Sequence, residues 1–262
     1  MNINDISTQL LYTTVPIYAK KNDGSLSSGT GFIFSIKETE NSSIPMLITN
    51  YHVLEGAIAG FVELHITEKG MPSMEKSIRV QFDKSIINGN KLGDLDLIAV
   101  PLAGTFNDFQ SKGIDVFFRS VDQNLIPTEE QINELAAIED VTFIGYPSGL
   151  YDDKNKISII RQGITATPIW NNFKGEDVFL IDAGVFPGSS GSPVFIYNRG
   201  TYPTKDGIAV GSRLMFVGVI AQTMLRDNST GKDYLNLGKV INSRAMYVEL
   251  QKFVKKLKGT MW

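Results

Sequence analysis

Short apolar runs dominate the chain, and each is rich in β-branched or aromatic residues and bounded by Gly, Pro, Asn or Asp. Ten such runs lie at 29–36, 45–54, 61–67, 78–82, 94–102, 141–147, 157–169, 178–184, 192–197 and 216–224. Many short strands separated by turn residues are typical of a β-sandwich or a β-barrel. The pattern therefore predicts an all-β fold without internal repeats.

Two segments have a helical pattern instead. The first opens at Thr128, which can cap a helix together with Gln131 in a capping box. The second is a C-terminal helix predicted over 243–258, where apolar residues recur on one face: Met246, Leu250, Phe253, Val254 and Leu257. Its lysines could face a membrane surface, but an apolar face docked on the protein with lysines in water is the favoured interpretation.

Composition excludes several classes of protein. The 262 residues are 42% hydrophobic and 20% charged, which is ordinary for a globular protein, and the net charge of -3 argues against a nucleic-acid partner. The absence of Cys rules out disulfides, and two His leave few ligands for zinc, so we expect neither a metal nor another cofactor. We see no signal peptide and no apolar run long enough to cross a bilayer. We therefore expect a cytoplasmic protein without membrane contact.

The two histidines differ in setting. His65 lies in an alternating strand, where a surface or structural role is favoured. His52 follows an apolar strand in LITNYHVL, at the point where that strand ends. Downstream, Asp94 and Asp96 precede an apolar strand; Asp94 suits a turn, whereas Asp96 abuts the strand directly. A carboxylate at that position needs a hydrogen-bond donor, and a histidine N–H is a suitable one.

The stretch PGSSGSP supplies the third group. Gly188 and Gly191 bracket Ser189 and Ser190, and glycine permits a tight turn that aims backbone N–H groups into one small space. Preorganised donors of this kind form an oxyanion hole. A serine nucleophile also needs a base and an orienting carboxylate, which His52 and Asp96 can supply for Ser190. The chain order His, Asp, Ser is one of the few recurring orders of such triads.

These residues lie in blocks that resemble the chymotrypsin-like serine peptidases, in particular the bacterial branch that includes the HtrA proteases. The matching blocks are SGTGFIF at 28–34, LITNYHVL at 47–54, DLIAVPL at 96–102, IDAGVFPGSSGSPVF at 181–195 and FVGVIAQT at 216–223. The segment 143–169 also resembles standalone bacterial trypsin-like peptidases. The resemblance covers most of the chain.

The resemblance implies a single peptidase domain over 1–262, built of two antiparallel six-stranded β-barrels at about 10–120 and 140–240. It further implies a serine endopeptidase of protein or peptide substrates, with His52, Asp96 and Ser190 as the triad. The backbone N–H groups of Gly188 and Ser190, with Ser189 as a further candidate, would bind the oxyanion.

The resemblance also places a substrate pocket. Gly184 would lie at its base, and Ala221, Gln222 and Thr223 would line its wall. None of these is charged, so we expect a small or medium apolar residue before the cleaved bond and not Lys or Arg. Asp182 is the one nearby carboxylate.

Three departures from the family matter. No PDZ-like domain follows the peptidase blocks in this sequence. Ser189 stands where the secreted trypsins carry the aspartate of their activation mechanism, and the chain has no Ile-Val-Gly-Gly, so that activation route is unavailable. The long segment 196–215 could gate the site or bind a regulatory partner, although a surface hairpin is favoured. The alternatives to an active peptidase are a peptidase-fold module that binds peptides without cutting them and, less well supported, an acyl hydrolase of non-peptide esters.

Overall fold

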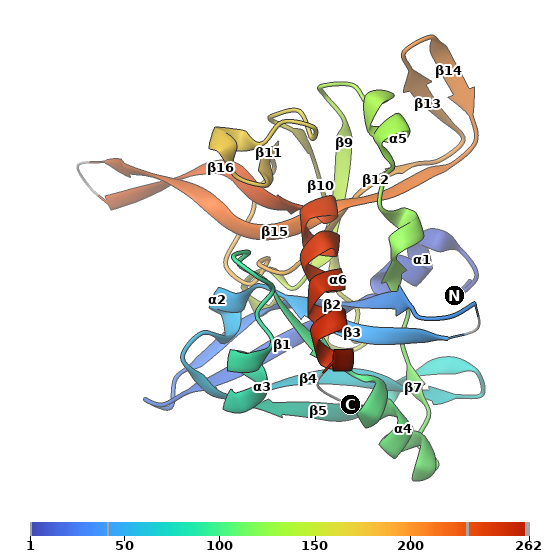
Figure 1. Cartoon of the computed structure of the whole chain (residues 1–262), viewed down its shortest axis with the longest axis vertical. Coiled ribbons are helices and arrows are strands. Elements are labelled where there is room, and N and C mark those ends of the chain that lie inside the picture. The colour runs from blue at the N-terminus through green and yellow to red at the C-terminus, as the bar shows by residue number, and fades with distance from the viewer. Residues whose placement is uncertain (1, 41, 229–230, 260–262) are drawn as a thin grey trace.

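The structure is a computed structural model that describes residues 2–40, 42–228 and 231–259, with side chains throughout except over 226–234. Strands dominate it, and the two halves of the chain form two β-sheet bodies, one above the other in Figure 1. The first contains a sheet with the strand order β5-β4-β1-β2-β3-β6. These strands are β1 (Thr14–Lys21), β2 (Leu26–Lys37), β3 (Ser43–Thr49), β4 (Ala57–Glu68), β5 (Met71–Asp83) and β6 (Ile98–Pro101).

Two short strands, β7 (Val116–Phe117) and β8 (Val121–Asp122), extend this barrel-like sheet at β4 and β2. β2 is buried on both faces along residues 29–36. Ile33 packs inside the first body, whereas Phe32 and Phe34 face the second body and lie beside Phe216. This two-sided burial explains why three large apolar residues follow one another at 32–34 and do not alternate with polar ones.

The second body is a closed barrel with the strand order β10-β11-β16-β15-β12-β9. Its strands are β9 (Asp140–Gly145), β10 (Ile159–Thr165), β11 (Val178–Asp182), β12 (Pro193–Asn198), β15 (Arg213–Asn228) and β16 (Gly231–Asn242). All their pairings are antiparallel. The predicted all-β fold with two barrel-like bodies is confirmed, but the first body has eight strands where six antiparallel ones were predicted, and its β2 and β8 pair in parallel.

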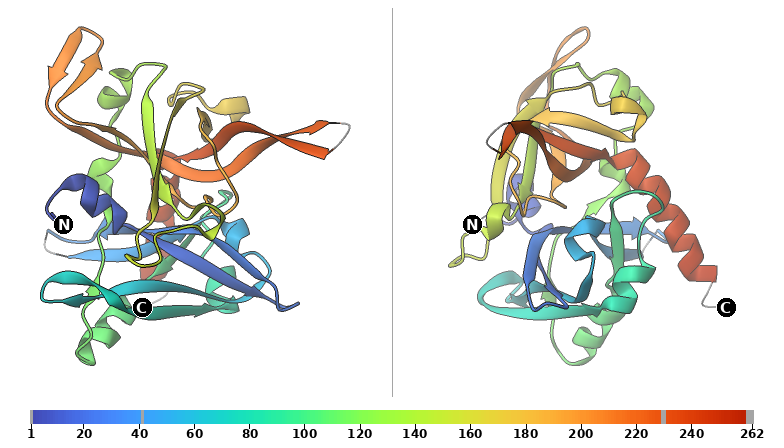
Figure 2. Two further views of the ribbon diagram at one scale, coloured as in Figure 1. Left: turned by 180° about the vertical axis from the view of Figure 1, so that it is seen from behind. Right: turned by 90° about the vertical axis from the view of Figure 1, so that its left-hand side faces the viewer.

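The C-terminal helix α6 (Ser243–Gly259) leaves the second barrel and runs down across the first, as Figures 1 and 2 show. Its buried face carries Met246, Leu250, Phe253 and Val254, which pack with residues of both bodies. Lys258 Nζ pairs with the Glu38 carboxylate of the first body at 2.7 Å. The predicted apolar face thus docks on the protein. No helix in the described part of the chain is long and apolar enough to span a membrane.

The helices are more numerous than the sequence pattern predicted. The predicted capping box of Thr128 and Gln131 is present, but the helix that it opens, α5 (Glu129–Asn133), is short. Further short helices lie between strands: α1 (Ile6–Leu11), α2 (Tyr51–Leu54), α3 (Lys84–Gly89) and α4 (Ala103–Ser111). Single 3-10 turns occur at Gln123–Leu125, Pro147–Gly149 and Phe173–Gly175. The segment 196–215 contains a two-stranded hairpin, β13 (Thr201–Thr204) and β14 (Gly207–Val210), which projects from the second body in Figure 1.

Candidate active site

The structure brings His52 and Asp96 together at the end of two neighbouring strands of the first body. His52 lies in α2, the single helical turn that follows β3, and Asp96 lies in the loop before β6, the partner of β3. The His52 ring contacts Asp96 between Nδ1 and Oδ2 at 2.6 Å, and the His52 backbone N–H donates to Asp96 Oδ1 at 2.9 Å. Both carboxylate oxygens of Asp96 are therefore used to position one histidine.

The backbone of Asp96 is fixed as well. Its carbonyl oxygen accepts hydrogen bonds from Asn50 Nδ2 at 2.8 Å and from the Tyr51 N–H at 3.2 Å. The side chains of His52 and Asp96 are 42% and 39% exposed, so the pair lies at the surface, where a ligand can reach it. A carboxylate on Nδ1 favours the tautomer that carries the proton there and leaves Nε2 free to accept one.

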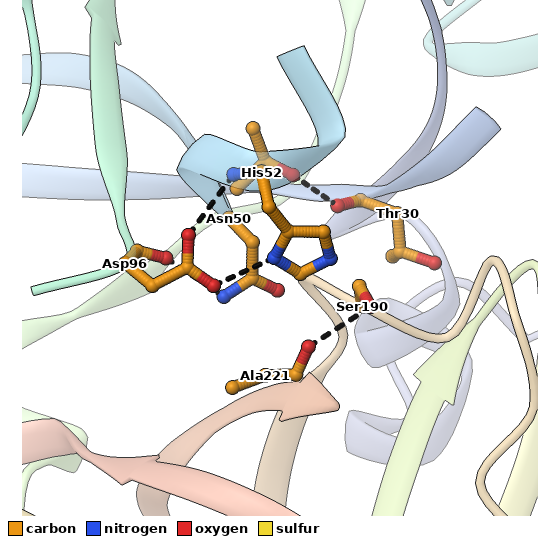
Figure 3. Close-up of polar contacts among 7 residues, drawn as sticks. Thr30, Asn50, His52, Asp96, Ser190 and Ala221 are labelled. Carbon is orange, nitrogen blue, oxygen red and sulfur yellow. Dashed lines mark hydrogen bonds and ion pairs between the residues drawn. The ribbon is translucent and has the colours of Figure 1, made fainter. Parts of the chain in front are cut away.

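Ser190 lies in the loop between β11 and β12 of the second barrel, and Figure 3 shows the His52 imidazole between Asp96 and Ser190. The Ser190 hydroxyl donates to the carbonyl oxygen of Ala221 at 3.0 Å. Among the described residues, no hydrogen bond joins this hydroxyl to the His52 ring. Rotation about one side-chain bond would release the Ser190 hydroxyl from Ala221.

The loop around Ser190 is shaped by two glycines with positive φ, Gly188 at +87° and Gly191 at +89°. A Cβ on Gly188 would lie 2.6 Å from the carbonyl oxygen of Tyr146 and 2.9 Å from the backbone nitrogen of Ser148. A Cβ on Gly191 would lie 1.9 Å from the carbonyl oxygen of Thr30. Both positions therefore require glycine, for space as well as for backbone conformation.

Two backbone donors of this loop remain available. The Pro187 carbonyl accepts from the Ser148 N–H at 2.5 Å, and because the peptide is trans and planar, the Gly188 N–H points the opposite way. The N–H groups of Gly188 and Ser190 have no acceptor among the described residues. The Ser189 N–H, by contrast, donates to the Phe186 carbonyl at 2.9 Å within the turn. Two of the three predicted oxyanion donors are thus free to bind a ligand.

Thr30 of β2 joins the two bodies behind the loop, and the sequence reasoning did not single it out. Its hydroxyl donates to the Gly188 carbonyl at 2.8 Å and accepts from the Tyr146 N–H at 3.0 Å. Its backbone N–H donates to the Ser190 carbonyl at 2.9 Å, and its side chain is completely buried. A threonine between two glycines in a buried strand is the only signal that the sequence offers for this role.

Only some of the predicted pocket residues line a cleft beside Ser190. A cleft beside Ser190, here called the nucleophile cleft, is lined by Phe186, Pro187, Ser190, Gln222, Thr223, Met224 and Leu225. Of the predicted pocket residues, Gln222 and Thr223 line this cleft, and the carbonyl oxygen of Ala221 accepts the hydrogen bond of the Ser190 hydroxyl. Gly184 does not line the cleft, and the guanidinium of Arg161 lies beside Gly184. Asp182 is exposed and ends β11.

His65 lies outside this site. Its Nδ1 contacts the Ser73 carbonyl at 2.8 Å and its Nε2 contacts the Lys156 carbonyl at 3.2 Å, so the ring connects the two bodies. Asp94 lies in an exposed turn before Asp96. Neither side chain forms a recorded contact with His52 or Ser190 among the described residues.

The family is shown by sequence: the model of the trypsin-like peptidase domain matches residues 29–201, so the chain belongs to this family. Among solved structures, it is similar to an HtrA-type protease, AlgW, solved with a tripeptide. The identity is 14%, the TM-score is 0.52, and the match covers 97% of this chain but 64% of that one. The chain thus spans less than two thirds of the length of that protease, and the likeness shows the fold.

A second similar structure is the Rv3671c protease from M. tuberculosis in its active form, with 17% identity, a TM-score of 0.48, and coverage of 95% of this chain and 84% of that one. No curated protein sequence matches the chain.

Proposed function

We propose that the protein is a serine endopeptidase that cleaves protein or peptide substrates, with Ser190 as nucleophile, His52 as general base and acid, and Asp96 as its orienting carboxylate. The observation that carries this proposal is the two-point contact of Asp96 with the ring and the backbone of His52. It holds the ring with its Nε2 side away from Asp96 and available to Ser190 (Figure 3).

The reaction would begin when the Ser190 hydroxyl turns from Ala221 toward His52. Ser190 Oγ would attack the substrate carbonyl while His52 Nε2 takes the proton, and the carbonyl oxygen would become an oxyanion. The N–H groups of Gly188 and Ser190, which have no acceptor among the described residues, would donate to it. His52 would then give its proton to the leaving amine, and water would release the acyl group by the same steps in reverse.

A second candidate function is peptide binding without cleavage. The observation that favours it is the Ser190 hydroxyl, which is bonded to Ala221 and not to His52. Serine-to-base hydrogen bonds are often long or absent before substrate binds, so this arrangement is compatible with both functions. A regulatory protein partner and a cytoplasmic location stay predictions from the sequence.

Labelling with a fluorophosphonate probe tests the proposal, because the probe reacts only with an activated serine. We expect the wild-type protein to be labelled, and Ser190→Ala and His52→Ala to be unlabelled while keeping the wild-type circular dichroism spectrum. Ser85→Ala is a matched control, since Ser85 is an exposed serine in α3 of the first body. An unlabelled wild-type protein would favour the binding module, and labelling that survives in Ser190→Ala would contradict the assignment of the nucleophile.

A further inference from the structure

One cation beside the nucleophile cleft, Arg161, has no anionic partner among the described side chains. Arg161 lies on β10, in register with Phe143 of β9, and therefore on the side of the strand that faces the barrel core. Its guanidinium carbon lies 5.0 Å from the centre of the Phe186 ring, which lines the cleft. A guanidinium nitrogen also lies 2.8 Å from the place that a Cβ on Gly184 would take. Arg161 thus occupies the space left by the missing side chain of Gly184.

Among the described side chains, Arg161 forms no ion pair, and its guanidinium donates no hydrogen bond. Lys239, a second cation near the cleft, differs in this respect. It is in register with Gln222 on β15, but its ammonium is paired with the Glu176 carboxylate. Arg161 is a half-buried residue whose guanidinium contacts the Phe186 ring and the space beside Gly184, and among the described residues it lacks the oxygen acceptors that it can bind in pairs.

A neutral donor of the same cleft is also unsatisfied. Thr223 lines the cleft, and its Oγ1 is buried without a hydrogen-bond partner. Its strand neighbour is Gly238, where a Cβ would lie 2.6 Å from a methyl carbon of Val185, the residue that follows Gly184. A buried hydroxyl without a partner is costly, so a bound group that accepts its hydrogen would be stabilised.

We propose, on the basis of the proposed peptidase function, that the nucleophile cleft selects an acidic residue, Glu or Asp, immediately before the cleaved bond, the P1 position, and that Arg161 determines this preference. The carbon atom that Ser190 attacks belongs to the P1 residue, so its side chain must enter the concavity beside Ser190. The Glu side chain carries two acceptor oxygens at the end of a short apolar stem. The stem would contact Phe186 and Gln222, which line the cleft, and the carboxylate would accept hydrogen bonds from the guanidinium of Arg161, which packs on Phe186, and from the Thr223 hydroxyl.

The other classes of P1 residue fit this cleft less well. A Lys or Arg side chain would bring a second cation toward Arg161, and no carboxylate among the residues that line the cleft would offset the repulsion. An apolar side chain would leave both Arg161 and Thr223 without acceptors and shielded from water. The sequence-based expectation of an apolar P1 residue considered Gly184, 221–223 and Asp182 and did not include Arg161.

The test measures binding to the Ser190→Ala variant, so that it does not depend on turnover. The probes are fluorescein-labelled hexapeptides Ala-Ala-Pro-Xaa-Ala-Ala with Glu, Gln, Leu or Lys as Xaa, followed by fluorescence anisotropy. We expect the Glu peptide to bind at least about 10-fold more tightly than its isostere Gln, as for a charge-assisted pair. Adding Arg161→Gln should remove this ratio, and Arg161→Glu should favour the Lys peptide.

Arg119→Gln is the matched control, because Arg119 also stacks on a phenylalanine, Phe117, but lies in the first body. It should leave the Glu-to-Gln ratio unchanged. Equal binding of the Glu and Gln peptides, no binding of any peptide, or a Glu preference that survives Arg161→Gln would each overturn the proposal. Fluorophosphonate labelling of the wild type separates these outcomes from a failure of the peptidase function: a labelled enzyme without a Glu preference is a peptidase of another specificity.

Discussion

The backbone N–H of Ser148 donates to the carbonyl oxygen of Pro187 at 2.5 Å, and this one contact sets the orientation of the Pro187–Gly188 peptide. Ser148 itself has a φ of +52°, which is uncommon for a residue with a side chain. The turn at Pro147–Gly149 thus stores some strain while holding the loop that carries the proposed nucleophile. If the peptide turned over, the Gly188 N–H would no longer be available to an oxyanion.

Gly188→Ala should therefore disable the oxyanion site without unfolding the protein. Its Cβ would collide with the backbone of Tyr146 and Ser148, so the loop must shift. We expect the rate of fluorophosphonate labelling and of peptide hydrolysis to fall by about 10²- to 10³-fold, as for the loss of one oxyanion donor. Gly113→Ala is the control, because Gly113 has a similar φ of +75° but open space around it, in the turn that follows α4 of the first body. An unchanged rate in Gly188→Ala would remove this donor from the proposed mechanism.

The contact of Asp96 with His52 gives a second prediction. In Asp96→Asn the amide cannot favour the same histidine tautomer, so Nε2 would lose its role as proton acceptor. We expect kcat to fall by about 10³- to 10⁴-fold with little change in KM or stability. Asp94→Asn, two residues away in an exposed turn, should keep wild-type kcat. Comparable losses in both variants would show that the effect comes from the loop and not from the carboxylate.

Thr30→Val should lower both stability and activity. The substitution keeps the shape of the side chain but leaves the Gly188 carbonyl and the Tyr146 N–H without their buried partner. We expect the free energy of unfolding, measured in urea, to fall by roughly 2 kcal/mol, and hydrolysis to slow because the loop is less well fixed.

Thr165 provides the matched control for this variant. It is also buried, and its hydroxyl likewise donates to a carbonyl, that of Ala137, and accepts from a backbone N–H, that of Glu139. Thr165→Val should therefore lose a similar amount of stability while keeping wild-type activity. Equal activity losses in the two variants would contradict a specific role of Thr30 in the site.

Tyr146 makes stability depend on alkaline pH. Burial raises the pKa of its phenol above the ordinary value of 10.0, although the hydroxyl donates to the Thr14 carbonyl at 3.3 Å. As pH rises above 10.0, the unfolded chain loses a proton that the folded chain retains, so the free energy of unfolding falls by up to ~1.4 kcal/mol per pH unit for this group. Urea unfolding at pH 8 and pH 11 should show a loss about 1 kcal/mol smaller in Tyr146→Phe than in the wild type. An identical loss in both proteins would mean that Tyr146 does not contribute.

The sequence was informative where a feature depends on neighbours along the chain. Apolar runs bounded by turn residues predicted the strands, and the residues flanking His52, Asp96 and Ser190 carried the family resemblance. The capping box at Thr128 depends on residues three positions apart and was also predicted. The short helix α3 was missed although Asp83, its N-cap, accepts from the N–H groups of Ser85 and Ile86. Its six residues are too few to show a helical period in the sequence.

Features that depend on strand register could not be predicted. The Thr30 hydroxyl meets the carbonyl of Gly188, 158 residues away. Arg161 meets Gly184 because β10 and β11 pair in one particular register within a closed barrel. A single residue of slip would turn the Arg161 side chain to the other face of its strand. Such pairings follow from the whole fold, which short sequence motifs do not specify.

The position of β16 and α6 after the Ser190 loop imposes an order on synthesis. A ribosome delivers His52 and Asp96 early and Ser190 much later, but the barrel that presents Ser190 closes only through β16. Helix α6, which covers the apolar surface shared by the two bodies, follows β16 in the chain and is synthesised after it. A growing chain or a prematurely terminated one therefore carries the three side chains apart from one another. Under the proposed function, the capacity to cut would arise only after β16 has been synthesised and has closed this barrel, so a growing chain that still lacks β16 could not cleave its neighbours.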